Sequence, residues 1–207
     1  MSTLLASRRA AAGGPDHGAT IIEFALVLPF LLLLGLGTVE MGLGWVAHDR
    51  LETAVAQAAR VAAVSGNRVE TDRDILVTLR ASLTAEALAN LDRVVVFKST
   101  DAGGAVPTGC IKVQGDTSQV GVSDACNTYT GASVRAASAV DMTGFGGGPT
   151  DLDRYWKPAL RKATLVGPPD YVGVWVRTTH HAVTGGFFGN ITMHKVSIFR
   201  IQPDMDG

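Results

Sequence analysis

The chain has 207 residues, which is enough for one membrane segment and one domain of ordinary size with its own hydrophobic core. Its formal net charge of -1 gives no electrostatic reason to expect nucleic acid as a partner. Charged residues make up 18% of the chain, below the roughly 25% typical of soluble domains. This deficit is concentrated near the N-terminus, in a single apolar segment.

The N-terminal region changes abruptly from polar to apolar. Residues 1–18 are small and polar, and they include the basic pair Arg8 and Arg9. Residues 24–39 contain no charged side chain, and the apolar character extends over residues 19–46. As a helix, this stretch would measure about 42 Å, more than the roughly 30 Å of hydrocarbon in a bilayer. The sequence therefore predicts one transmembrane helix, with its N-terminus in the cytoplasm because the two arginines precede it.

The helical pattern continues beyond the apolar segment. Apolar residues recur at helical spacing, with polar residues on the other faces: Leu51, Val55, Ala58, Ala59 and Ala62. Gly66 and Asn67 then form a helix stop signal. We expect one helix of roughly 45 residues, longer than an ordinary globular helix. It occupies residues 19–66 and leads into a domain formed by residues 67–207.

A second helix is predicted at the start of that domain. Residues 71–74, Thr-Asp-Arg-Asp, have the form of a capping box, and Ile75, Leu79 and Leu83 follow at helical spacing. Residues 130–150 are rich in Gly, Ala and Ser and are expected to form a long surface loop.

Strands are indicated in the rest of the domain. Residues 94–97 are a β-branched run, and residues 110–113 alternate and could be its hairpin partner. Residues 171–178 and 193–201 also alternate and are separated by turn signals, which predicts an antiparallel pair. The predicted fold is α+β, with a long N-terminal transmembrane helix that extends into an extracytoplasmic domain of helices packed on antiparallel strands.

The only two cysteines, Cys110 and Cys126, both follow the apolar segment. An isolated pair in an extracytoplasmic domain is best interpreted as a disulfide. Zinc binding is disfavoured because their spacing matches no zinc pattern and no histidine lies between them. Free thiols remain the alternative.

No constellation of residues indicates catalysis. Adjacent His180 and His181 on a strand would point to opposite faces, so we expect surface histidines and no metal site. The glycines of residues 144–148 lack the Lys-Ser/Thr of a phosphate-binding loop. We expect no catalytic residues and no cofactor, and hence no enzyme. A membrane-tethered hydrolase would be the enzymatic alternative, and it would need a clustered catalytic set that the sequence does not display.

The junction between the polar leader and the apolar segment is the most informative stretch. Gly18 ends the leader, and Glu23 stands at the mouth of the apolar run, where a charge is costly unless it is paired or lies near the interface. A cut after Gly18 would give Ala19 a free α-amino group. That amine could pair with the Glu23 carboxylate of a neighbouring subunit, and a glycine before the cut suits a peptidase that works on extended backbone.

Residues 18–29, GATIIEFALVLP, and the Gly-rich residues 35–42 resemble TadE-like proteins, the pseudopilins of the tight-adherence (Tad, Flp or type IVc) pilus. The resemblance implies that a prepilin peptidase cleaves between Gly18 and Ala19. It also implies a functional glutamate at the fifth mature position, Glu23, followed by the aromatic Phe24.

The same resemblance implies a function and a location. The protein would be a single-pass subunit of the bacterial cytoplasmic membrane, with its C-terminal domain outside, that takes part in assembly of an adhesive pilus. Its location would be the membrane or the surface pilus itself. Its partners would be the prepilin peptidase, other pilin-like subunits in homo- or hetero-oligomers, and the Tad secretion machinery.

Two other interpretations of the N-terminus remain. A secretory signal peptide is disfavoured because Glu23 interrupts the start of the apolar region and the helical pattern continues far beyond any cut. An uncleaved anchor, with Glu23 at the headgroup boundary, would instead make the protein a membrane-anchored extracytoplasmic binding module.

Glu40 is the second charge within the apolar segment. We interpret it as the outer interfacial end of the span, and the alternative is a pair with another helix in an assembly.

Overall fold

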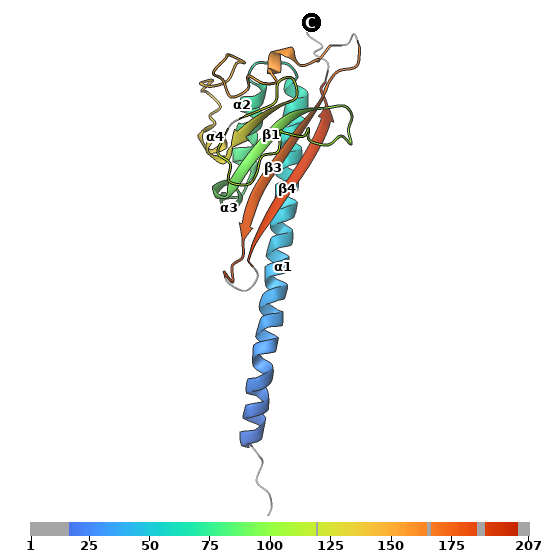
Figure 1. Ribbon diagram of the computed structural model, residues 1–207. Coiled ribbons are helices and arrows are strands. Elements are labelled where there is room, and N and C mark those ends of the chain that lie inside the picture. Colours follow the sequence, from blue (N-terminus) through green and yellow to red (C-terminus); the bar gives the residue numbers. More distant parts are fainter. Residues whose placement is uncertain (1–16, 119, 165–166, 186–188, 203–207) are drawn as a thin grey trace, which may run out of the picture. The chain divides into compact units, whose positions relative to one another are not determined.

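The structure is a computed structural model that describes residues 17–118, 120–164, 167–185 and 189–202 (Figure 1). The chain divides into two compact units, residues 1–39 and residues 40–207. Helix α1 (His17–Ser65) begins in the first unit and ends in the second. The predicted helix over residues 19–66 is present, and in the structure it begins two residues earlier and ends one residue earlier.

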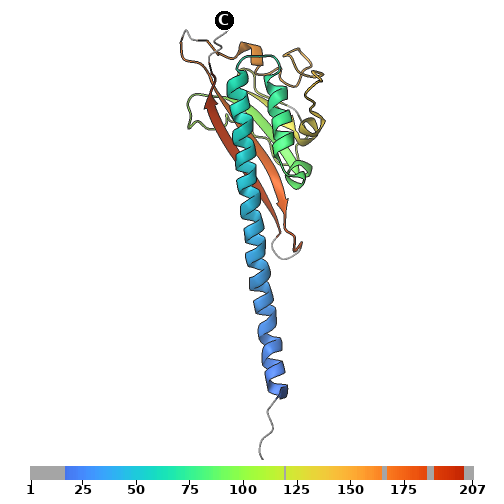
Figure 2. The ribbon, with the colours of Figure 1, turned by 180° about the vertical axis from the view of Figure 1, so that it is seen from behind.

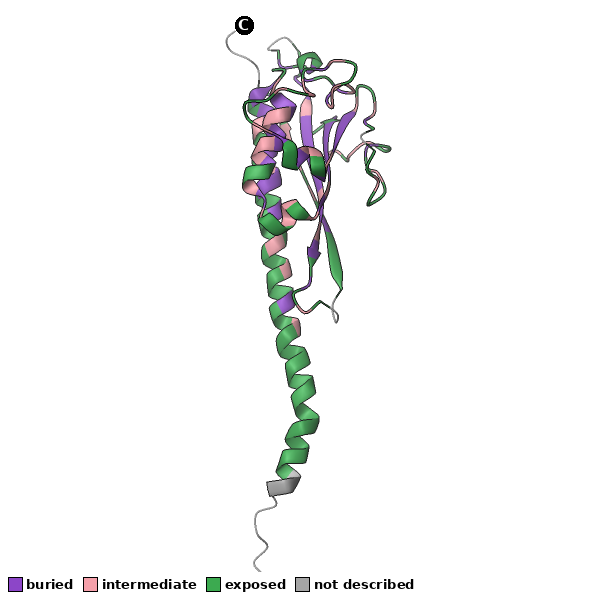
Figure 3. Ribbon diagram, turned by 90° about the vertical axis from the view of Figure 1, so that its left-hand side faces the viewer, coloured by how far each residue is buried: buried purple, intermediate pink, exposed green. Residues whose placement is uncertain are grey.

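The described part of the first unit consists of helix α1 alone. Its side chains from residue 20 to residue 39 are exposed, apart from the half-exposed Gly37, and most of them are apolar (Figure 3). Exposure of Phe24, Phe30 and Leu34 to water would be unfavourable. The helix is long and apolar enough to cross a membrane, so it anchors the chain as a single-pass membrane protein.

The described part of the second unit contains one antiparallel sheet with the strand order β2-β1-β3-β4. The strands are β1 (Leu91–Ser99), β2 (Cys126–Thr130), β3 (Tyr171–His181) and β4 (Asn190–Arg200). The predicted strands at the C-terminal end are confirmed as the antiparallel pair β3 and β4, and both are longer than predicted. The fold class, α+β, is confirmed.

Helices cover one face of this sheet. They are the second part of α1, α2 (Thr71–Ser82), α3 (Ala85–Ala89) and α4 (Gly131–Ala136). The 3-10 turn η1 (Pro158–Leu160) lies in the long segment between α4 and β3. In Figure 2, α1 and α2 lie side by side across the sheet. The alternation of β1 sends Val94 and Val96 into this main core, where they join α1 residues such as Val55 and Ala58. Small alanines on α1 permit a close approach of helix and sheet.

The other face of the sheet carries a smaller core around the disulfide. Val95 and Phe97 of β1 pack there with Trp175 of β3 and with the Cys110–Cys126 bridge, whose Cα atoms lie 6.2 Å apart. The predicted disulfide is thus present. Gly173 of β3 faces the ring of Phe97, and a methyl group at this glycine would collide with the ring.

The predicted strand at residues 110–113 is wrong. Cys110 lies in a turn, and residues 111–113 form no strand. The alternating apolar side chains of Ile111 and Val113 are exposed and do not pack on the sheet. Strand β1 is instead flanked by β2 and β3. The predicted loop over residues 130–150 is also partly wrong, because it begins with helix α4.

Two local predictions failed at buried polar residues. Helix α2 occurs where it was predicted, but Glu70 is its N-cap and makes no side-chain capping bond, while Asp72 is fully buried. His180, expected on the surface, is buried, and its Nδ1 lies 2.9 Å from the Glu86 carboxylate. In both cases a tertiary partner determines the position of the side chain.

Candidate functional site

The predicted processing and assembly residues lie in the first turns of α1. Gly18 and Ala19 have helical backbone, and their side chains lie outside the described part of the chain, as do residues 1–16 of the predicted leader. Glu23 and Phe24 are one turn further on, and both are exposed. Among the described residues, no cation lies within ion-pair distance of Glu23.

Glu40, by contrast, has partners within its own chain. Its carboxylate accepts hydrogen bonds from the backbone N–H groups of Val183 at 2.9 Å and Thr184 at 3.3 Å. The Thr184 hydroxyl lies 3.4 Å from the same carboxylate. Glu40 is only 4% exposed. The sequence interpretations, the outer interfacial end of the span or a pair with another helix, did not anticipate this contact with the segment that follows β3.

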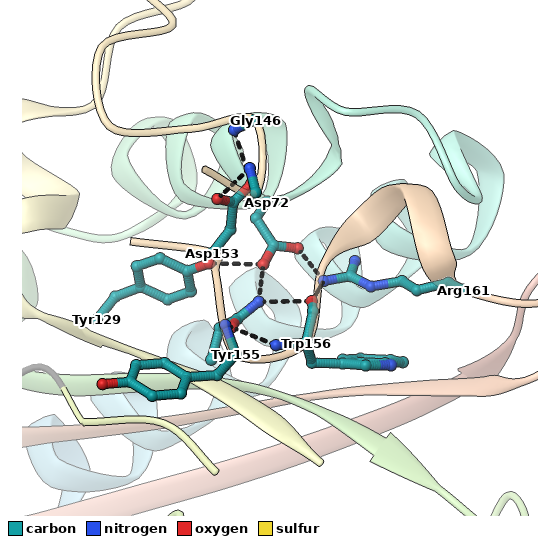
Figure 4. Close-up of polar contacts among 9 residues, drawn as sticks. Asp72, Tyr129, Gly146, Asp153, Tyr155, Trp156 and Arg161 are labelled. Atoms are coloured by element: carbon teal, nitrogen blue, oxygen red, sulfur yellow. Dashed lines mark hydrogen bonds and ion pairs between the residues drawn. The ribbon is translucent and has the colours of Figure 1, made fainter. Parts of the chain in front are cut away.

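A buried polar cluster joins three parts of the α+β domain (Figure 4). Its centre is the carboxylate of Asp72 on α2, which accepts hydrogen bonds from the Tyr129 hydroxyl at 2.5 Å and the Asn127 amide at 2.7 Å. Arg161 Nη2 forms an ion pair with the same carboxylate at 2.6 Å. Helix α2, strand β2 and the segment after η1 are thereby connected.

The backbone around residues 146–156 completes this cluster. Asn127 accepts hydrogen bonds from the N–H groups of Tyr155 and Trp156. Asp153 accepts from the N–H groups of Gly146 and Gly147, at 3.0 and 2.8 Å. The long Gly-rich segment is therefore held to the domain by directed hydrogen bonds as well as by packing.

Burial dominates the electrostatics of the cluster. Burial raises the pKa of the Tyr129 phenol well above its ordinary value, and the adjacent Asp72 carboxylate raises it further. Burial also raises the pKa of Asp153, against the opposing effect of its two backbone donors. Because Asp72 and Arg161 have no exposed side-chain surface, a substrate cannot reach them. The cluster serves to hold the domain together.

Sequence reasoning missed this cluster. Its members are far apart in the chain, and Asp72 was noted only as part of the predicted capping box of residues 71–74. No local pattern could have paired it with Tyr129 or Arg161.

The N-terminal region matches the model of a known protein family. Residues 18–60, about a fifth of the chain, match the family model described as TadE-like protein. This segment includes Gly18, Ala19, Glu23 and Phe24 as well as Glu40. No curated protein and no solved structure matches the chain significantly.

These findings define the chain first as a single-pass membrane protein with an α+β domain. Over residues 18–60 its N-terminal region is similar to TadE-like proteins.

Proposed function

We propose that the protein is a pilin-like, TadE-type subunit that a prepilin peptidase cleaves between Gly18 and Ala19 and that then takes part in assembly of a tight-adherence pilus. Its role is structural, and it is not an enzyme. The observation that carries this proposal is the exposed Glu23, which stands at the start of an apolar helix within the TadE-like segment.

The physical argument concerns the charge of Glu23. A carboxylate at the edge of an apolar span is costly unless it is paired or hydrated, and the described residues of the chain offer it no cation. Cleavage after Gly18 would create that cation at Ala19. Because positions 19 and 23 are four residues apart, they lie on the same face of α1. A neighbouring helix in contact with this face would therefore meet both charges.

Pairing between neighbours would also fix their relative positions. The amine of one subunit and the carboxylate of the next would be the charged groups of a helix segment that has no other charge up to residue 39. Only one axial offset brings them together, so the pair would set the register in which subunits assemble. The apolar surface around Phe24 would supply much of the association energy without specifying that register.

Two further observations support an orientation with the α+β domain outside the cytoplasm. Arg8 and Arg9 precede the span, which favours a cytoplasmic N-terminus. The Cys110–Cys126 disulfide is typical of an oxidising compartment. The partners in this proposal are the prepilin peptidase, other pilin-like subunits and the Tad secretion machinery.

Charge-removing and charge-keeping variants test this function. We expect Glu23→Gln to reach the membrane at the normal level but to fall at least about tenfold in the sheared pilus fraction, while Glu23→Asp keeps substantial incorporation, because a salt bridge of this kind requires the charge. Immunoblots of membrane and pilus fractions give both quantities. Normal incorporation of Glu23→Gln would contradict a role for the Glu23 charge in assembly, whereas absence of the unsubstituted protein from the pilus fraction would favour an uncleaved, membrane-anchored binding module.

A further inference from the structure

The contact between Glu40 and the β3–β4 connection places one end of the sheet at a defined level of helix α1. Val183 and Thr184 directly follow β3, and their N–H groups donate to the Glu40 carboxylate. The segment that holds them therefore lies beside the helix at residue 40. It cannot lie further along the helix while these hydrogen bonds exist.

Residue 40 lies close to the end of the membrane span. Glu23 and Glu40 are about 25 Å apart along a continuous α-helix at roughly 1.5 Å per residue. The hydrocarbon core of a bilayer is about 30 Å thick. With Glu23 at one boundary, Glu40 lies about 5 Å short of the opposite boundary, and its hydrogen-bonded segment lies at the same depth.

Exposed apolar side chains surround this point. Met41 is 79% exposed, Trp45 73% and Val183 75%. Met41, Trp45 and the half-exposed Ile191 of β4 also line an apolar groove of about 330 Å³ beside α1. We refer to Met41, Trp45, Val183 and Ile191 as the apolar rim.

Beyond the rim, α1 becomes rich in charged and polar side chains. Asp49 and Arg50 are exposed, and the exposed residues of α1 from there to residue 60 are all polar. Trp45 lies about 7 Å beyond Glu40 along the helix axis. That height corresponds to the headgroup region, where tryptophan is enriched in membrane proteins.

We propose that the apolar rim is a membrane-docking surface, so that the segment after β3 lies in the boundary between headgroups and acyl chains, next to the span. The occupant is the lipid bilayer, because the rim is continuous in sequence with a helix that spans it. A second copy of the chain would not need to lie at the level of Glu40. This inference does not depend on processing at Gly18.

Docking explains why Glu40 is paired inside the chain. At this depth water is scarce, so an unpaired carboxylate would be costly. The two backbone N–H groups satisfy it without another charged side chain. The hydrogen bonds then hold the segment to the helix, and the exposed Val183 side chain contacts lipid.

Tryptophan quenching in lipid nanodiscs tests the proposal on the full chain. The discs contain one copy each and are made of phosphatidylcholine and phosphatidylglycerol with bromines near the glycerol end of the acyl chains. The probe is Val183→Trp in a Trp45→Phe background, in which Trp156 and Trp175 stay buried in the domain. The matched control is Val140→Trp in the same background, since Val140 is apolar and 92% exposed but lies outside the rim.

We expect the brominated lipid to reduce the Val183→Trp contribution to emission at least about twofold and to leave Val140→Trp unchanged. Equal, unquenched emission from both variants would overturn the proposal. Quenching that appears only in discs with two copies would also overturn it, because it would assign the rim to a second copy. Near-UV circular dichroism of each variant verifies the native fold.

Glu40→Gln tests the role of the hydrogen bonds. In the Val183→Trp probe we expect this substitution to lower the quenching at least about twofold. In a separate Glu40→Gln variant that keeps Trp45, this tryptophan, on the helix itself, should stay quenched. Unchanged quenching of the Val183→Trp probe would contradict a role for Glu40 in holding the segment at the membrane.

Discussion

The Asp72 carboxylate and the Arg161 guanidinium lie 2.6 Å apart, and neither side chain is exposed to solvent. Arg161 also stacks over the ring of Trp156, with its Cζ atom 4.1 Å from the ring centroid. This pair connects helix α2 to a segment that has little regular structure. We therefore regard it as the principal polar contact of the α+β domain.

Removal of one partner should destabilise the domain strongly. Arg161→Met leaves the Asp72 charge buried and uncompensated, and we expect it to lower the free energy of unfolding by about 3–5 kcal/mol. Chemical unfolding of the full chain in detergent, followed by near-UV circular dichroism, measures this change. In the double variant Asp72→Leu with Arg161→Met, part of the loss should return, because no charge remains buried.

An exposed pair provides the control. Lys195 Nζ and the Glu52 carboxylate are also 2.6 Å apart, but the Glu52 side chain is largely exposed. Lys195→Met should cause no resolvable loss of stability, because solvent screens such pairs. Equal effects of the two single substitutions would show that distance alone, and not burial, governs these contacts.

Tyr129 should make the domain sensitive to alkaline pH. Its folded-state pKa lies well above the ordinary value of 10.0, so above about pH 10 the unfolded chain releases the phenol proton while the folded chain retains it. The folded state then binds more protons, and stability must fall as pH rises. We expect Tyr129→Phe, though less stable at neutral pH, to lose less stability between about pH 9 and pH 11. Denaturant midpoints across that range measure the difference, and parallel curves would refute the assignment.

Local sequence signals predicted the parts of the fold that depend on local chemistry. The uncharged run of residues 24–39 predicted a helix that spans a membrane. The alternating residues of β3 and β4 predicted two paired strands. The disulfide followed from the presence of only two cysteines, in a domain predicted to lie outside the cytoplasm.

Strand β2 was missed because its sequence, CNTYT, looks like a polar loop. Asn127 and Thr128 are nevertheless buried, and Asn127 is satisfied by Asp72 and by the backbone of Trp156. Its partner on α2 lies 55 residues away in the sequence. The same limit applies to Glu40, whose partners follow 143 and 144 residues later. Such pairings depend on tertiary structure and leave no local pattern.

The disulfide should matter most for the smaller core. The segment between Cys110 and Cys126 has little regular structure of its own, and it packs on β1 through Cys110 and Val122. Replacement of both cysteines by alanine should lower the free energy of unfolding by about 3 kcal/mol, the value expected for a loop of this length.

Hydrogen exchange should locate this loss. We expect the largest increase in exchange within the described residues 106–118 and 120–126, with smaller changes in α2. A uniform increase across the domain would indicate that the bridge stabilises the whole fold and not this face of the sheet.

Processing at Gly18 is the central claim of the proposed function, and the mass of the N-terminus tests it most directly. The protein is extracted from membranes of cells with and without their prepilin peptidase, and its N-terminal peptide is identified by mass spectrometry. We predict a mature chain that begins at Ala19 and is lost when the peptidase is absent. An intact N-terminal leader in both strains would contradict the claim and leave a permanently anchored binding domain as the better explanation.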